Sequence, residues 1–209
     1  MSIRPGKIVC VGRNYRDHAK ELGNDVPTAP LLFLKPPSAV IADGEPIVLP
    51  PASKQVEWEG EVGIVVGRRL RKADAREAAA AVQSVVALND VTARDLQKAE
   101  PQWTRAKGFD TFCPVGTPAA APADLATLTV VTRVNGEERQ RGKVTDMVFD
   151  IPGLLAYISQ VMTLEPGDLV ATGTPAGVGK LSPGDTVAVE IIGPNGVVSR
   201  VENPVVEDR

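Results

Sequence analysis

The sequence predicts a mixed α/β fold that is rich in short β-strands and has few, short helices. The 18 prolines and 19 glycines, with only 4% aromatic residues, favour many turns over long helices. Two Asn-Gly dipeptides between apolar runs are typical of tight β-hairpins. The 43% hydrophobic content can fill one substantial core in 209 residues. We therefore expect a single domain over residues 1–209, with an N-terminal segment (1–45) and a β-rich core (46–209).

The N-terminal segment combines two short strands with one helix. Residues 7–12 and 31–35 are apolar runs of strand length. Residues 13–23 are polar and predict a short helix between the strands. Asn14 is the expected N-cap of this helix, and Gly23 is expected to end it in the left-handed conformation.

Two further helices have recognisable starts. Asp74 opens a capping box before an alanine-rich helix that we expect to run towards Gln83 and to lead into a strand ending at Asp90. Asp150, followed by isoleucine and proline, predicts a helix that continues to about Met162.

The two Asn-Gly dipeptides place two hairpins in the second half of the chain. Asn135-Gly136 connects residues 130–134 to a partner strand around Glu138. Asn195-Gly196 connects residues 187–192 to residues 197–201.

Carboxylates at alternate positions give the strongest chemical signal. Glu59 and Glu61 lie in residues 57–66, whose composition predicts one strand, so their side chains share a face. The apolar run 85–88 leads to Asp90, which would join them if the two strands are neighbours.

Three converging carboxylates repel each other unless a cation holds them. Oxygen ligands favour Mg²⁺ or Mn²⁺, and Ca²⁺ less, whereas a single histidine in the chain excludes a His-rich zinc or iron site. The alternative is a solvated acidic edge strand with Glu57 as its third member, the more frequent outcome for a Glu-x-Glu pair taken alone.

The only histidine, His18, precedes Glu21 by three residues, so on a helix both side chains share a face. A carboxylate there would orient the imidazole and raise its basicity, which suits a general base. An exposed helical His–Glu pair explains the same spacing equally well.

Two cations and one loop are further candidates for binding an anionic ligand. Lys107 has aromatic and glycine neighbours rather than charged ones, which suggests partial desolvation. Arg94 follows Asp90 by four residues and could hold a substrate carboxylate, or could pair with Asp95 instead. The glycine-rich residues 172–180 lack the pattern of a Walker phosphate loop, but offer backbone N–H groups to a carboxylate.

Composition excludes several classes of protein. A net charge of −3 without a dense Lys/Arg block argues against a nucleic-acid surface. No stretch approaches the ~20 apolar residues that a membrane span needs, and no signal peptide is apparent. Cys10 and Cys113 do not make a disulfide framework and are expected in or near the core. We expect a cytoplasmic protein with a small-molecule partner.

In their order and spacing, five motifs together resemble the fumarylacetoacetate hydrolase family, in its short acylpyruvase and oxaloacetate decarboxylase branch. The resemblance extends from Lys7 to Pro204. The motifs are Val11-Gly12-Arg13-Asn14-Tyr15, Glu59-Gly60-Glu61, Asn89-Asp90-Val91-Thr92-Ala93-Arg94-Asp95, Ala106-Lys107-Gly108-Phe109-Asp110 and Thr172-Gly173-Thr174-Pro175-Ala176-Gly177-Val178-Gly179.

The resemblance implies a mixed β-roll with few helices, usually a homodimer, and a role for each motif. The implied metal ligands for Mg²⁺ or Mn²⁺ are Glu59, Glu61 and Asp90. Lys107 and Thr174 are implied to contact a bound 2-oxo acid, and Arg94 and Gln97 match family positions near the substrate carboxylate. The implied catalytic residues are Lys107 and the pair His18 and Glu21 on a lid helix.

The resemblance also implies cleavage of a C–C bond in a 2,4-dioxo acid such as acetylpyruvate or fumarylpyruvate, decarboxylation of oxaloacetate, or both. Each reaction would pass through a pyruvate enolate. An isomerase of an unsaturated 2-oxo or 2-hydroxy dicarboxylate is the enzymatic alternative. A barrel that binds metal and a 2-oxo acid without catalysis is the alternative from another class.

Overall fold

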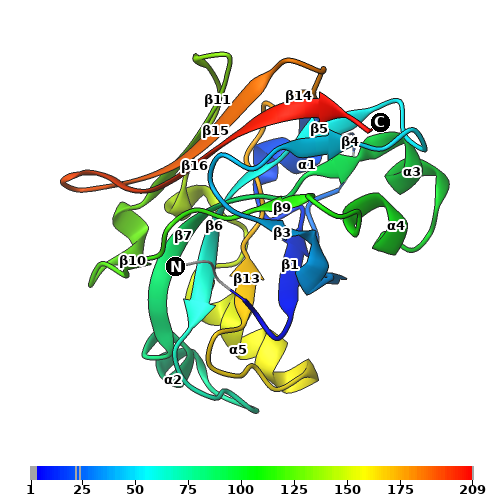
Figure 1. Cartoon of the computed structure of the whole chain (residues 1–209). Coiled ribbons are helices and arrows are strands. Elements are labelled where there is room, and N and C mark those ends of the chain that lie inside the picture. The colour runs from blue at the N-terminus through cyan, green and yellow to red at the C-terminus, as the bar shows by residue number, and fades with distance from the viewer. Residues whose placement is uncertain (1–3, 22, 24, 209) are drawn as a thin grey trace.

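The computed structural model describes residues 4–21, 23 and 25–208 and has the β-rich mixed α/β fold that the sequence predicts (Figure 1). Its central sheet has six strands in the order β10-β7-β6-β13-β1-β2. These strands are β1 (Ile8–Gly12), β2 (Leu31–Lys35), β6 (Gly60–Val66), β7 (Val82–Asn89), β10 (Ala119–Ala120) and β13 (Leu169–Ala171). The parallel pairing of β1 with β13 places the start of the chain inside this sheet.

The second sheet has five strands in the order β12-β11-β15-β16-β4. They are β4 (Ile47–Leu49), β11 (Thr129–Val134), β12 (Glu137–Lys143), β15 (Thr186–Gly193) and β16 (Gly196–Glu207). Both predicted hairpins form, but the turn of the second consists of Pro194 and Asn195, because Gly196 already pairs with Gly193. Asn135 and Gly136 have φ angles of 54° and 80°, as the tight turn between two twisted strands requires.

Two small sheets complete the β-structure of the described residues. One joins β14 (Gly179–Lys180), β5 (Val56–Trp58) and β8 (Thr92–Ala93), and the other joins β3 (Val40–Ile41) and β9 (Cys113–Pro114). Buried apolar residues between the central and five-stranded sheets form the largest core cluster, for example Val62, Ile64 and Val130.

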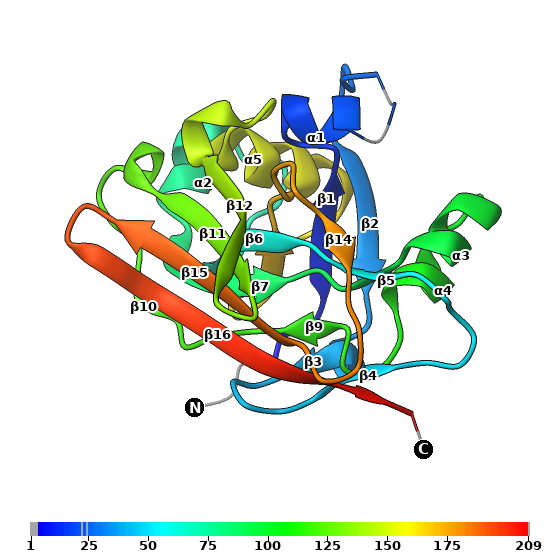
Figure 2. The same ribbon diagram turned by 90° about the horizontal axis from the view of Figure 1, so that it is seen from above.

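The helices are short. They are α1 (Arg16–Glu21), α2 (Ala75–Ala79), α3 (Arg94–Ala99), α4 (Thr104–Lys107) and α5 (Ile151–Val161), with single 3-10 turns at η1 (Pro37–Ala39), η2 (Leu125–Thr127) and η3 (Val144–Asp146). Figure 2 shows α1 beyond the ends of β1 and β2, with α3 and α4 beside β5. Within the described residues, none of the helices has the length and apolar character needed to cross a membrane.

Three further local predictions need correction. The helix that begins after Asp74 ends at Ala79 rather than near Gln83, because pairing with β6 starts β7 at Val82. Asn14 does not cap α1, since its side chain bonds the backbone of Phe149 instead.

The third correction concerns residues 57–66, which are two strands rather than one. The chain leaves the small sheet after β5 and joins the central sheet at β6, with Glu59 between them. Outside a strand, the Glu59 backbone N–H donates to Asn89 Oδ1 at 2.9 Å, and its carbonyl accepts from Asp90 N at 2.8 Å. This break therefore fixes Glu59 beside the end of β7.

Candidate active site

The three carboxylates predicted to converge, Glu59, Glu61 and Asp90, do so in the interior and are called the triad below. One oxygen each of Glu59, Glu61 and Asp90 lies within 4.8 Å of the others, and all three residues are buried. The antiparallel pairing of β6 with β7 creates this arrangement. Gly60 pairs with Asn89, so the start of β6, with Glu59 and Glu61, lies beside the end of β7, which Asp90 follows. The alternative of a solvated acidic edge strand is therefore wrong.

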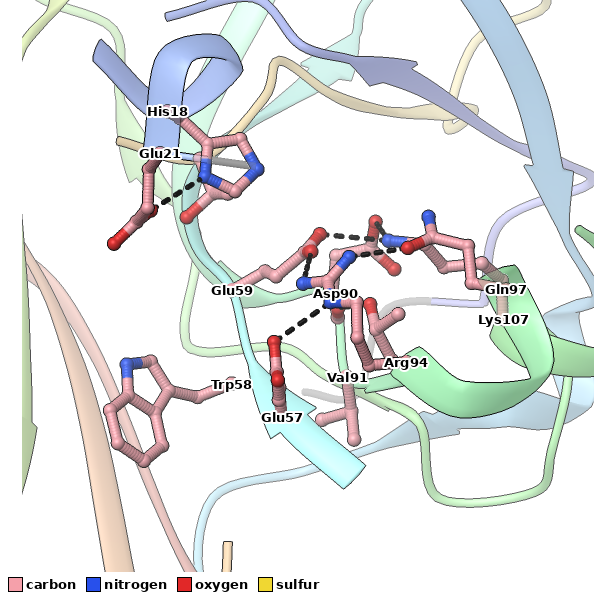
Figure 3. Close-up of polar contacts among 12 residues, drawn as sticks. His18, Glu21, Glu57, Trp58, Glu59, Asp90, Val91, Arg94, Gln97 and Lys107 are labelled. Carbon is pink, nitrogen blue, oxygen red and sulfur yellow. Dashed lines mark hydrogen bonds and ion pairs between the residues drawn. The ribbon is translucent and has the colours of Figure 1, made fainter. Parts of the chain in front are cut away.

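Lys107 joins two of these carboxylates. Its Nζ lies 2.8 Å from Glu59 Oε2 and 2.6 Å from Asp90 Oδ2, and the lysine is 2% exposed (Figure 3). Burial by itself would lower the pKa of Lys107, but Asp90 and Glu59 outweigh it and raise the pKa. Lys107 is therefore a fixed cation at the triad, as its uncharged sequence neighbours suggest.

Arg94 holds the other side of Glu59. Its guanidinium donates to Glu57 Oε2 at 2.8 Å, to Glu59 Oε1 and to Gln97 Oε1 (Figure 3). Burial alone would raise the pKa of Glu59, but Lys107 and Arg94 hold it well below its ordinary value. Asp95 instead bonds Ser53 and the Lys54 backbone, so Arg94 and Asp95 do not form the alternative pair.

Glu61 is the carboxylate of the triad without a lysine or arginine partner among the described residues. Its Oε2 accepts a hydrogen bond from the Gly173 backbone at 2.7 Å. Gly173 has a φ of 103°, and a Cβ at this position would lie only 2.7 Å from the Cβ of Asn14. Both the backbone conformation and the lack of space therefore favour glycine here. Burial first, and then Asp90 and Glu59, raise the pKa of Glu61 well above its ordinary value. A further cation beside Glu61 would favour ionisation of all three carboxylates together.

Thr174 follows directly in the glycine-rich loop. Its hydroxyl donates to the Gly60 carbonyl at 2.9 Å and accepts from Gln140 Nε2 at 2.8 Å. Gln140 also accepts from the Gly60 N–H at 3.0 Å through Oε1. The loop is thereby tied to the strand that carries Glu61.

Sequence reasoning missed two residues of this cluster. Lys35, at the end of β2, is buried and lies 2.7 Å from Asp90 Oδ1 and 3.0 Å from the Val91 carbonyl. Gln140, in β12, is the clamp between Gly60 and Thr174. The only signal for Lys35 in the sequence is a charged residue at the end of an apolar strand, and Gln140 lies in an otherwise charged segment that gives none.

His18 and Glu21 lie together on α1, above the triad in Figure 3. His18 Nδ1 is 3.2 Å from Glu21 Oε2, and Oε1 of the same carboxylate accepts from the Gly177 backbone at 3.0 Å. His18 is only 4% exposed, so the solvated helical pair is not what the fold produces. The hydrogen bond to Gly177 connects the helix to the loop that holds Glu61.

All the predicted site residues line one cavity of about 450 Å³. They are His18, Glu21, Glu59, Glu61, Asp90, Arg94, Gln97, Lys107 and Thr174. Phe33 and Trp103 add an aromatic wall, with ring centroids 5.4 Å apart. The cysteines contribute no nucleophile here: Cys10 and Cys113 are buried and free, and burial raises the pKa of both thiols, to about 12 for Cys113.

The donor set fits a hard divalent cation. Glu59, Glu61 and Asp90 provide only oxygen ligands, and the unpaired charge of Glu61 would be compensated by such an ion. A cavity of this kind has the donor set of a divalent-metal-dependent enzyme.

This chain belongs to the fumarylacetoacetate hydrolase family, whose C-terminal region (Fumarylacetoacetate (FAA) hydrolase C-terminal) matches residues 7–206. The mitochondrial oxaloacetate decarboxylase of Dictyostelium discoideum is 44% identical over 195 residues, 90% of this chain and 89% of that protein. The mitochondrial oxaloacetate tautomerase of Caenorhabditis elegans is 43% identical over 187 residues, 87% of each.

Solved structures agree with this assignment. The crystal structure of 2-hydroxyhepta-2,4-diene-1,7-dioate isomerase from Mycobacterium marinum matches with a TM-score of 0.88 and 43% identity, over 99% of this chain and 76% of that one. The resemblance inferred from the motifs is confirmed. The relatives support an enzyme of this family, but they carry names of different reactions, so the reaction is a separate question.

Proposed function

We propose that this chain is a Mg²⁺- or Mn²⁺-dependent enzyme that cleaves the C3–C4 bond of a 2-oxo acid. The substrate is an acylpyruvate, oxaloacetate, or both. One observation carries the proposal: the carboxylate triad, the buried Lys107 and the His18–Glu21 pair line the same cavity. The relatives from Dictyostelium discoideum and Caenorhabditis elegans are named for reactions of oxaloacetate, which is a 2-oxo acid of this class.

Glu59, Glu61 and Asp90 would hold the cation. When bound, the cation supplies a Lewis acid for the carboxylate and keto oxygens of the substrate. Lys107, an ammonium beside Glu59 and Asp90, would stabilise the negative charge that reaches the enolate oxygen as the C3–C4 bond breaks.

His18 would activate water for acylpyruvate hydrolysis. With Nδ1–H donating to Glu21, Nε2 is free to accept a proton from water, whose oxygen attacks the distal carbonyl. The bond electrons pass to C3, the distal fragment leaves as a carboxylic acid, and a proton returned to C3 gives pyruvate. Oxaloacetate instead loses CO₂ without any attack by water, so it needs the enolate-stabilising groups but not the base.

Tautomerisation or isomerisation is the second candidate reaction. It requires only proton transfer through an enolate of the intact oxo acid, for which His18 would move the proton and Lys107 would stabilise the enolate charge. The names of the relatives from Caenorhabditis elegans and Mycobacterium marinum favour it. Binding without catalysis is the third alternative, and the presence of His18, Glu21 and Lys107 in the cavity weighs against it.

A substrate panel tests the proposal. The protein is dialysed against EDTA and assayed with Mg²⁺ or Mn²⁺ on acetylpyruvate, fumarylpyruvate and oxaloacetate, with pyruvate measured as product and enol–keto exchange followed separately. Cation-dependent pyruvate formation supports cleavage, and exchange without pyruvate favours the isomerase. Full turnover in excess EDTA would refute the metal assignment.

We also propose that the chain acts as one catalytic domain, in a cytoplasmic homodimer.

A further inference from the structure

Arg13 lines the cavity but has no part in the proposed mechanism. It follows β1 directly and is half-buried. Among the described residues, no carboxylate lies within ion-pair distance of it. In contrast, Lys107, Lys35 and Arg94 each bind carboxylates of the triad or its neighbour Glu57. Arg13 is thus a cation of the cavity wall that is available to a ligand.

The backbone at Arg13 gives no reason for an arginine. Its φ is 58°, in the left-handed region, which costs a non-glycine residue on the order of 1 kcal/mol. The neighbours impose this conformation, because Gly12 pairs with Leu31 and the Asn14 side chain donates to the Thr172 carbonyl at 2.8 Å. Glycine or asparagine would adopt it at lower cost, so the function of Arg13 lies in its side chain.

The charge of the cavity wall is uneven. The triad side already contains acidic groups paired with lysine and arginine, and it would also bind the divalent cation. Away from the triad and its partners, the charged lining residues are Arg13, Lys98, His18 and Glu21. The Glu21 carboxylate is already bonded to His18 and to Gly177. Within the described part of the chain, Arg13 and Lys98 are therefore the charges of this wall that are not compensated by a carboxylate. A second anionic group on the substrate would therefore be attracted here.

We propose that Arg13 binds a distal carboxylate of the substrate and makes the site selective for dianionic 2-oxo acids over those with an apolar distal end. This inference rests on the proposed function, because it assumes that the 2-oxo carboxylate end binds at the triad. Guanidinium suits the role, since its planar fork can donate two hydrogen bonds to one carboxylate. Lys98 is exposed and adds a weaker, screened attraction.

Binding of two matched ligands tests Arg13 without turnover. 2-Oxoglutarate and 2-oxopentanoate have the same chain length and differ only in a distal carboxylate or methyl group. Calorimetry with Mn²⁺ present should show that Arg13→Ala lowers the affinity for 2-oxoglutarate about 10- to 100-fold, as expected for a lost charge-assisted hydrogen bond. The affinity for 2-oxopentanoate should stay within about threefold of the wild-type value. Arg13→Lys should restore part of the affinity. Alanine has the same backbone cost as arginine at this φ, so the difference between the wild-type protein and Arg13→Ala reports the contribution of the arginine side chain alone.

Arg16→Ala is the matched control, because Arg16 is an exposed arginine three residues on, outside the cavity wall. Oxalate, which is too short to extend beyond the metal-binding end, should bind all variants equally and reports an intact triad. An equal loss of affinity for both oxo acids, or for neither, would overturn the inference.

In the activity assay, Arg13→Ala should raise KM for oxaloacetate and not for acetylpyruvate. If the wild-type protein turns over no 2-oxo acid, the proposed function fails, while the calorimetric comparison still decides the role of Arg13.

Discussion

The ammonium of Lys35 lies 2.7 Å from Oδ1 of Asp90, and both residues are buried. Lys107 holds the second oxygen of the same carboxylate at 2.6 Å. Asp90 is therefore fixed from two sides by cations that come from β2 and α4. Such an arrangement orients a ligand carboxylate before any metal arrives, at the cost of desolvating several charges.

Lys35→Met should destabilise the fold. The substitution retains most of the side-chain volume but leaves Asp90 with one cation, and removal of one partner from a buried ion pair costs about 3–5 kcal/mol. Urea unfolding in EDTA measures the loss, with the exposed Lys54→Met as control. An unchanged unfolding midpoint would show that Lys107 alone compensates Asp90.

Glu61→Gln should stabilise the metal-free protein increasingly as pH rises. Because the folded-state pKa of Glu61 is raised above the ordinary 4.5, the carboxyl carries no penalty below pH 4.5 and destabilises the fold as pH rises from there through the raised pKa. The free-energy difference should grow by up to about 1.4 kcal/mol per pH unit. Unfolding in EDTA at several pH values, with exposed Glu165→Gln as control, checks this. A pH-independent difference would contradict the raised pKa.

Metal binding should release a proton from Glu61 at pH values below its raised pKa, since a ligating carboxylate must ionise. Calorimetric titration with Mg²⁺ or Mn²⁺ in buffers of different ionisation enthalpy gives the number of protons released.

Glu61→Ala should abolish metal binding with the fold intact, because the variant removes a carboxylate that has no lysine or arginine partner in the described part of the chain. Wild-type metal affinity in Glu61→Ala would show that the ligands were wrongly chosen.

Lys107→Ala should slow acylpyruvate hydrolysis and oxaloacetate decarboxylation alike. Both reactions develop enolate charge, and loss of one preorganised electrostatic donor typically costs about 10²–10³-fold in kcat. Steady-state assays with saturating Mg²⁺ test this. Arg105→Ala is the control, because Arg105 lies two residues earlier on α4 but pairs with Glu100 and is exposed. Near-normal rates for Lys107→Ala in both reactions would reduce Lys107 to a structural counterion.

His18→Ala should affect the two reactions unequally. Hydrolysis needs a base for water and should fall about 10²–10⁴-fold, whereas decarboxylation needs no nucleophile and should fall less. Glu21→Gln should give a milder form of the same pattern, since Glu21 orients the imidazole. The exposed Lys20→Ala, on the same helix, is the control. Equal losses in both reactions would withdraw His18 as the water-activating base.

Signals that act over a few residues were readable in the sequence. Asp74 and Asp150 begin their helices because each carboxylate accepts from a backbone N–H three residues ahead. Asn135-Gly136 makes its hairpin because both residues tolerate positive φ. The triad was a candidate metal site in the sequence, since Glu59 and Glu61 alternate in one segment and Asp90 follows an apolar run, but a solvated acidic strand is the more frequent outcome for such a pair taken alone.

Only the tertiary structure decided how those carboxylates are compensated. Lys35 reaches Asp90 across 55 positions, and Gly173 reaches Glu61 across 112. Asn14 has the residue type of a helix cap, yet its side chain bonds Thr172 and Phe149 from other parts of the chain. Pattern and propensity describe what neighbouring residues can do for each other, whereas the partners of a buried charge depend on which distant strands pair and where each one ends.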